Sequence, residues 1–160
     1  MKGVKVTMHI PKFLRIAFLG LLSLVISSQV FAQEEEIEKR RLFMESNSDA
    51  AAKAIKKAVA AKDYPTIELK AKEIMGNMDK LLDHFPKGSL SAKSRAKPEI
   101  WERWDEFSKH PGNVKKAAQD LADAAKAGDE EGVNSKVKAL GAACKGCHEP
   151  FRAEKKKSGG

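Results

Sequence analysis

The sequence predicts an all-α protein folded as an antiparallel, up-down-up-down four-helix bundle. Helical spacing of apolar residues is the only periodicity we find in residues 33–160, and strand-like alternation is missing. Four amphipathic stretches follow one another with mostly short connections, which place consecutive helices antiparallel. A segment of this length forms one domain with a single hydrophobic core.

The first two helices are predicted from Glu34 to about Ala61 and from about Pro65 to Phe85. Pro65 suits a first helical turn, because the amide that proline lacks has no partner there. Pro86-Lys87-Gly88 ends the second helix. The apolar stripes on these two helices are Ile37, Met44, Ala51, Ile55 and Ala58, then Ile67, Ala71, Ile74, Met78, Leu81 and Phe85.

Residues 86–97 are polar and predict a loop, after which a third helix begins at Pro98. We expect a kink or break at residues 110–113, where the sequence is His-Pro-Gly-Asn, because proline removes a backbone donor and glycine is a poor helix former. The fourth helix follows Gly128, with Asp129 as its N-cap. Its inward face carries Val133, Val137, Leu140, Cys144, Cys147, His148 and Phe151.

Residues 1–32 have the pattern of a secretory signal peptide. Four basic residues precede a short apolar run from Ile16 to Val25, and Val30-Phe31-Ala32 forms a small-residue cleavage site. The run is short for a membrane span of about 20 residues, although an uncleaved anchor is an alternative. Removing this segment lowers the net charge from +8 to +4, so half of the basic excess belongs to it. We expect cleavage after Ala32 and a periplasmic mature chain, 33–160.

The motif Cys144-Lys-Gly-Cys147-His148 contains both cysteines of the sequence. Cys-x-x-Cys-His is the motif for covalent haem attachment, in which both thiols join the haem and the histidine faces the iron. A thioredoxin-like redox pair and half of a zinc site are the alternatives. No βαβ pattern surrounds the pair, and a zinc site needs more ligands than the motif supplies.

The motif lies within the fourth predicted helix. Residues three and four apart share a face of a helix, so Cys144, Cys147 and His148 project together. One helix therefore holds the haem by its edge and its iron, and the haem lies against the neighbouring helices. Pro150 cannot donate to the carbonyl of Gly146, so we expect a local distortion there.

A four-helix chain that ends in this motif resembles the cytochrome c′ family, the class II cytochromes c. Ile37-x-x-Arg40-x-x-x-Met44 is similar to the family's pattern in the first helix. Pro98-Glu99-Ile100-Trp101 with Phe107 is similar to its Pro-x-Ile-Trp segment. The segment from Gly141 through Cys144 to Arg152 is similar to the family's C-terminal pattern Gly-x-x-Cys-x-x-Cys-His-x-x-(aromatic)-Arg. Pro150 and the break at residues 110–112 depart from the pattern.

The resemblance implies one covalently attached haem c with His148 as an iron ligand, and it makes Met44 the decisive residue. In the high-spin members a bulky apolar residue stands at this position, and the five-coordinate iron binds small gases such as nitric oxide. In the low-spin members a methionine there ligates the iron, which suits an electron carrier. On periodicity alone, Met44 could equally be an ordinary methionine of the hydrophobic core. Met75 and Met78 on the second predicted helix are the other thioethers that compete with it as iron ligands, and we take them as core residues.

Two haem propionates need partners, and we expect Arg40 and Arg152 to supply them, since a guanidinium matches a carboxylate with two hydrogen bonds. Arg41 is expected in solvent. By the resemblance, Trp101 and Phe85 are positioned to pack on the haem, although they could equally be core aromatics.

The sequence thus predicts a periplasmic electron carrier with a six-coordinate His/Met haem. A five-coordinate protein that binds nitric oxide is the alternative. An enzyme is disfavoured, because no acid, base and nucleophile candidates converge on a pocket. We expect redox proteins as partners and no nucleic acid. We also expect no stable membrane span in the mature chain and either a monomer or a homodimer.

Overall fold

The computed structural model describes residues 34–91 and 94–154, together with their side chains except those of residues 48–50. The predicted signal peptide lies outside the described residues. Four long helical segments form the bundle, and no strand occurs among the described residues, where one isolated antiparallel bridge joins Ala96 and Arg152. The all-α bundle is confirmed.

The first helical segment changes its winding halfway along. Residues 34–45 are α-helical, residues Ser46–Ala52 form the π-helix η1, and α2 (Lys53–Ala61) completes the segment. The π-helical stretch reads Ser-Asn-Ser-Asp-Ala-Ala-Ala, and serine, asparagine and aspartate are poor helix formers in general because their side chains can bond to nearby backbone groups. Asn47 shows this directly, since its side-chain amide donates to the carbonyl of Phe43 at 2.9 Å.

The second helix, α3 (Tyr64–Met78), starts as predicted and ends earlier. Asp63 is its N-cap and accepts a hydrogen bond from the amide of Thr66 at 3.2 Å. The chain then continues as the 3-10 turn η2 (Leu81–His84). Gly76, Asn77 and Asp79 have low helix propensity, which explains why the α-helix stops before the predicted Phe85.

The predicted third helix is divided into α4 (Glu99–Glu102), α5 (Trp104–Phe107) and α6 (His110–Lys126). The break therefore comes at Arg103 and again just before His110, upstream of its expected place. Pro111 lies in the first turn of α6, where its missing amide donor costs nothing.

The last helix, α7 (Glu130–Phe151), begins at the predicted N-cap. Asp129 accepts a hydrogen bond from the amide of Gly132 at 2.9 Å. Gly128, with φ +66°, supplies the left-handed residue that ends the preceding helix. Helix α7 continues through Pro150, and the amide of Arg152 donates to the carbonyl of His148 at 3.0 Å. The proline therefore lies in the last turn and does not break the helix.

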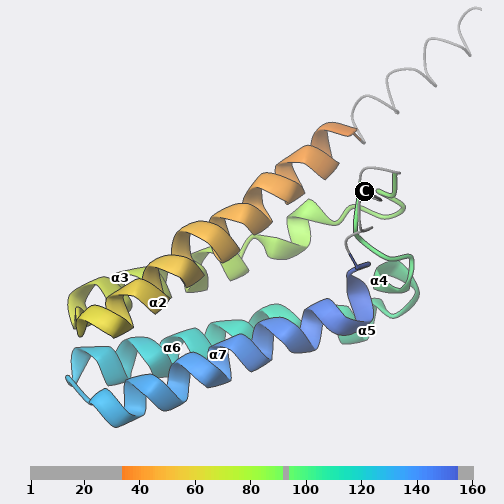
Figure 1. The fold of residues 1–160 in the computed structure, drawn as a ribbon. Helices are drawn as coiled ribbons and strands as arrows, with labels where there is room; N and C mark the ends of the chain where they lie inside the picture. Colours follow the sequence, from red (N-terminus) through yellow and green to blue (C-terminus); the bar gives the residue numbers. More distant parts are fainter. Residues whose placement is uncertain (1–33, 92–93, 155–160) are drawn as a thin grey trace, which may run out of the picture.

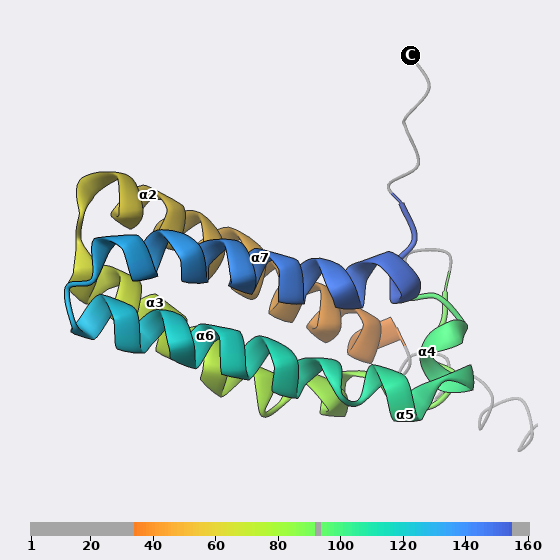
Figure 2. The same cartoon turned by 90° about the horizontal axis from the view of Figure 1, so that it is seen from below.

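Figures 1 and 2 show two antiparallel helical hairpins packed together. The first helical segment, which ends in α2, forms one hairpin with α3, and α6 and α7 form the other. Their tight turns lie at the same end of the bundle. Helices α4 and α5 lie at the opposite end, beside the C-terminal end of α7. Buried apolar residues from all four long segments form one core, which includes Ile55, Ile67, Ala71, Ala118, Leu121, Val133 and Leu140. No described helix combines the length and the apolar character needed to cross a membrane.

A buried arginine ties the first helix to the loop that follows η2. Arg40 is only 5% exposed, and its guanidinium donates to the carbonyl of Ser89 at 2.8 Å and to its hydroxyl at 3.0 Å. It also donates to the Ser94 hydroxyl at 3.0 Å and to the His84 carbonyl at 3.4 Å, and it lies over the ring of Phe85. Arg40 thus fixes His84, Ser89 and Ser94 against the first helix.

The buried stripe of α6 sets a first prediction. Leu121 is 0% exposed, and Leu121→Ala is expected to lower the free energy of unfolding by about 2–5 kcal/mol through lost burial and a residual cavity. The matched control is Leu69→Ala on α3, because Leu69 is 63% exposed and the change should stay within about 0.5 kcal/mol. Urea unfolding of both variants measures the difference, and equal losses would contradict the packing described here.

The Arg40 contacts set a second prediction. Arg40→Gln removes a buried charge that donates four hydrogen bonds, so the free energy of unfolding is expected to fall by about 2–3 kcal/mol. Urea denaturation followed by circular dichroism measures this loss. Arg41→Gln is the control, since Arg41 is exposed and should change stability little. A stability unchanged in Arg40→Gln would show that the loop does not depend on this contact.

Candidate functional site

Helix α7 places the three residues of the motif on one half-buried face. Cys144, Cys147 and His148 are each partly buried, whereas Lys145 and Gly146 between them are exposed. The spacing of three and four residues therefore has the result predicted from helical geometry. This part of α7 lies at the end of the bundle where α4 and α5 are found, away from the two tight turns (Figure 2).

A cavity of about 540 Å³ lies between this face and the first helix. Its size falls in the range of about 300–1,000 Å³ typical of cofactor and ligand sites. The first helix contributes Met44 to its wall, and α7 contributes Cys147 and His148. The other lining residues are Ile37, Arg40, Arg41, Glu45, Phe85, Ser94, Arg95, Ala96, Ile100, Phe107, Phe151 and Arg152.

A second, more open cavity of about 450 Å³ adjoins the same helix end. Cys144 lines this cavity and not the larger one. Arg95, His148 and Arg152 line both cavities, so these three residues form the partition between them. The two cysteines of the motif therefore line different cavities, and His148 lines both.

The imidazole of His148 is held in its neutral form. Burial, followed by the positive charges of Arg152 and Arg95, lowers its pKa to about 4. A neutral imidazole offers a lone pair and is the form that coordinates a metal. At neutral pH, His148 is therefore ready to act as a ligand.

The two thiols are held in their protonated form. Burial raises the pKa of Cys144, and burial together with the neighbouring Cys144 raises the pKa of Cys147 to about 11. A thiolate is the reactive form of cysteine, so a raised pKa is the opposite of what a redox-active pair needs. Within the described residues, no group of three or more His, Cys, Asp or Glu side chains is arranged to hold a metal ion.

The methionines are separated by the structure. Met44 lines the larger cavity, whereas Met75 and Met78 of α3 do not and instead belong to the core or pack against it. Met44 is therefore the thioether that shares a cavity with His148.

The predicted haem-edge residues have different surroundings. Arg152 lines both cavities, and Arg40 lines the larger one although its guanidinium is bound to protein oxygens. Phe85 also lines the larger cavity. Trp101 is not among the lining residues of either cavity, and its indole donates to the carbonyls of Phe85 and Pro86 at 3.2 and 3.0 Å.

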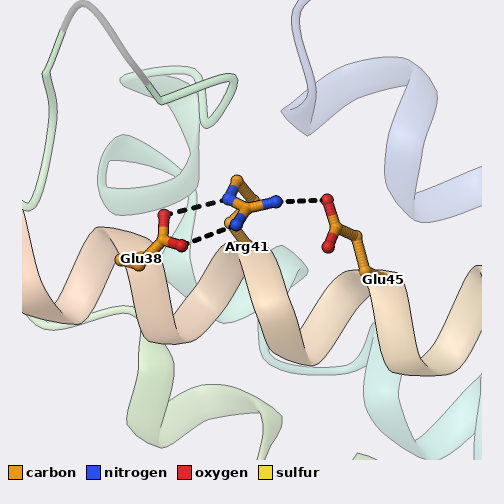
Figure 3. Close-up of polar contacts among 3 residues, drawn as sticks. All are labelled: Glu38, Arg41 and Glu45. Atoms are coloured by element: carbon orange, nitrogen blue, oxygen red, sulfur yellow. Dashed lines mark hydrogen bonds and ion pairs between the residues drawn. The ribbon is translucent and has the colours of Figure 1, made fainter.

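Arg41 is exposed, as the sequence predicts, and lies at the rim of the larger cavity. It is bound between Glu38, at 2.6 and 2.9 Å, and Glu45 (Figure 3). Glu45 also lines the rim, and its charge is balanced by this arginine.

Sequence reasoning missed Arg95, which lies in the polar segment predicted as a loop. Its side chain donates from Nε to the carbonyl of Ala153 at 2.9 Å, and the amide of Ala153 donates back to the carbonyl of Arg95 at 2.8 Å. These bonds join the loop to the end of α7. No periodicity or motif marks a loop arginine, so the sequence carries no signal for this position.

Comparison with known proteins agrees with this geometry. A family model described as Cytochrome C′ matches residues 35–152. A cytochrome c-556 from Agrobacterium tumefaciens (strain II Chrys) is 35% identical over 127 residues, which cover 75% of this chain and 98% of that protein. Cytochrome c′ from Rhodospirillum rubrum is 39% identical over 85 residues, which cover 52% of this chain and 58% of that protein.

Solved structures show the same fold. A cytochrome c′ described as having an unusual ligand-controlled dimer dissociation matches with a TM-score of 0.69 and 27% identity, over 76% of this chain and 97% of that one. Cytochrome c prime from Shewanella frigidimarina also gives a TM-score of 0.69 at 21% identity, a likeness of fold alone. The chain therefore belongs to the cytochrome c′ family, whose members carry covalently attached haem c.

Proposed function

We propose that this protein is a periplasmic electron carrier in which His148 and Met44 ligate the iron of one covalently attached haem c. The observation that supports this most is that Met44 and His148 line the same cavity from two different helices. The remaining core methionines near this end do not reach that cavity.

The residues of the larger cavity fit a haem. Its wall combines aromatic and aliphatic side chains with arginines, which suits a flat apolar ring that carries carboxylates. The neutral imidazole of His148 is the form that coordination needs. Cys144 and Cys147 are both free, as the formation of two thioether bonds requires. When bound, haem c supplies an iron that accepts and releases one electron.

The chemistry of the two ligand side chains favours an electron carrier. Met44 would supply a thioether, a soft ligand that stabilises ferrous iron, and Met44 together with His148 would keep the iron's ligands the same in both oxidation states. A methionine held by the first helix also blocks the position at which a small gas would bind. The alternative function, a five-coordinate protein that binds nitric oxide, requires that Met44 be unbound or displaceable.

The surroundings of the arginines support different tasks for them. Arg152 lines both cavities and is the better partner for a haem propionate, whereas the guanidinium of Arg40 is bound to loop oxygens. We place Trp101 in a supporting role, because its indole holds the loop at Phe85 and Pro86. Export by residues 1–32, with cleavage after Ala32, would bring the chain to the compartment in which cytochromes c are assembled. Its partners there would be redox proteins.

The spectrum of Met44 variants tests the ligand assignment. The purified holo-protein is expected to show a low-spin spectrum with a weak band at the red end of the visible range, which arises from the bond between methionine sulfur and ferric iron. Met44→Leu removes the sulfur at similar volume, so the band should disappear and the spectrum should become high-spin. Met75→Leu on α3 is the matched control and should keep the band.

A high-spin spectrum in the unmodified protein would overturn the electron-carrier proposal in favour of gas binding. If the band is lost in Met75→Leu and kept in Met44→Leu, the sulfur ligand comes from α3 and not from the first helix, and the assignment of Met44 is wrong.

Cysteine variants test the covalent attachment. Cys144→Ser with Cys147→Ser is expected to leave no haem attached to the chain after extraction with acidified acetone, because a hydroxyl does not form the thioether. The single variants should each retain attachment through one bond. Haem staining of a denaturing gel measures the retained haem, and haem that stays attached in the double variant would contradict the assignment.

A further inference from the structure

The arginines at the larger cavity differ in how many of their hydrogen-bond donors the fold already uses. A guanidinium has five N–H donors, four of them on its two terminal nitrogens. In Arg40 each terminal nitrogen donates two hydrogen bonds, all to oxygens of His84, Ser89 and Ser94. Arg40 therefore has no terminal donor left for a carboxylate.

Arg95 is in the opposite situation. Its Nε donates to the Ala153 carbonyl at 2.9 Å, and the paired backbone bond to Ala153 fixes the position of the residue. Its two terminal nitrogens donate to no oxygen of the described chain. Arg95 is thus held at its base while four donors remain for another group.

Arg152 lies beside Arg95 on the partition between the two cavities. Burial and then the charge of Arg95 lower the pKa of Arg152, which agrees with two cations close together. Neither guanidinium forms an ion pair with a carboxylate of the described residues. Of the nearby acids, Glu45 is bound to Arg41 and Glu149 is bound to Lys145 at 3.2 Å, while Glu154 lines the smaller cavity.

Two adjacent cations without an acidic partner repel each other, and an anion placed between them removes this cost. Paired guanidinium groups bind carboxylates with directed, charge-assisted hydrogen bonds. We propose that Arg95, together with Arg152, forms a binding site for a carboxylate or similar oxyanion beside His148. This inference rests on the proposed occupation of the larger cavity by haem, whose propionate is one source of the anion. A free oxyanion from solution is the other.

Resonance Raman spectroscopy of the purified holo-protein tests this site, since the bending mode of a haem propionate shifts when its hydrogen bonds change. If the anion is a propionate, Arg95→Gln shifts this mode, and Arg95→Lys, which keeps the charge, shifts it less. Lys116→Gln on α6 removes one exposed charge that lines neither cavity, and it should leave the mode unchanged. Phosphate added to the unmodified protein should then cause no saturable change.

If the anion comes from solution, added inorganic phosphate changes the haem spectrum saturably in the unmodified protein and not in Arg95→Gln. A propionate mode unaffected by Arg95→Gln, together with no saturable effect of phosphate, would overturn the proposal. The sulfur–iron band is measured on the same samples and reports on Met44 alone. An absent band in the unmodified protein would therefore reject the Met44 assignment without affecting the test of Arg95.

Discussion

The cavity end of the bundle depends on a chain of polar contacts that starts at the buried guanidinium of Arg40. This side chain binds the loop at Ser89 and Ser94, and the loop then pairs with the end of α7 through the bridge between Ala96 and Arg152. The first helix, the loop and α7 are thereby connected at the place where Met44 and His148 share a cavity. A buried cation costs free energy unless it is hydrogen-bonded, and here four bonds compensate it.

In this arrangement, holding the loop and offering free donors to a haem propionate fall to different arginines, whereas the sequence suggested one arginine on the first helix for the propionate. An arginine one turn before the candidate ligand is a natural partner for a propionate, and Arg40 was expected to fill that role. Its burial and its bonds to loop oxygens give it a structural role as well, at the wall of the same cavity. The free donors at the cavity belong to Arg95 and Arg152 instead, and both contribute to keeping the imidazole of His148 neutral.

Much of the fold was predictable, because helical periodicity and capping are local properties. Asp129 and Pro65 marked helix starts correctly, and the spacing within the Cys-x-x-Cys-His motif placed its three residues on one face. The π-helix after Met44, the early end of α3 and the break of the third helix at Arg103 were not predicted, and the break expected at residues 110–113 lies just before His110. They depend on competition between side chains and backbone, as at Asn47, and on where a proline is best tolerated, as at Pro111. Arg95 was missed because its position comes from a long-range pairing with Ala153, which no local pattern encodes.

The central claim is that the thioether of Met44 and the imidazole of His148 ligate the same iron. X-ray absorption at the iron edge of the ferric holo-protein tests it most directly, because sulfur and nitrogen scatter differently in the first coordination shell. We predict one sulfur neighbour, which is absent from the Met44→Leu variant. A first shell made of nitrogen alone in the unmodified protein would contradict the claim.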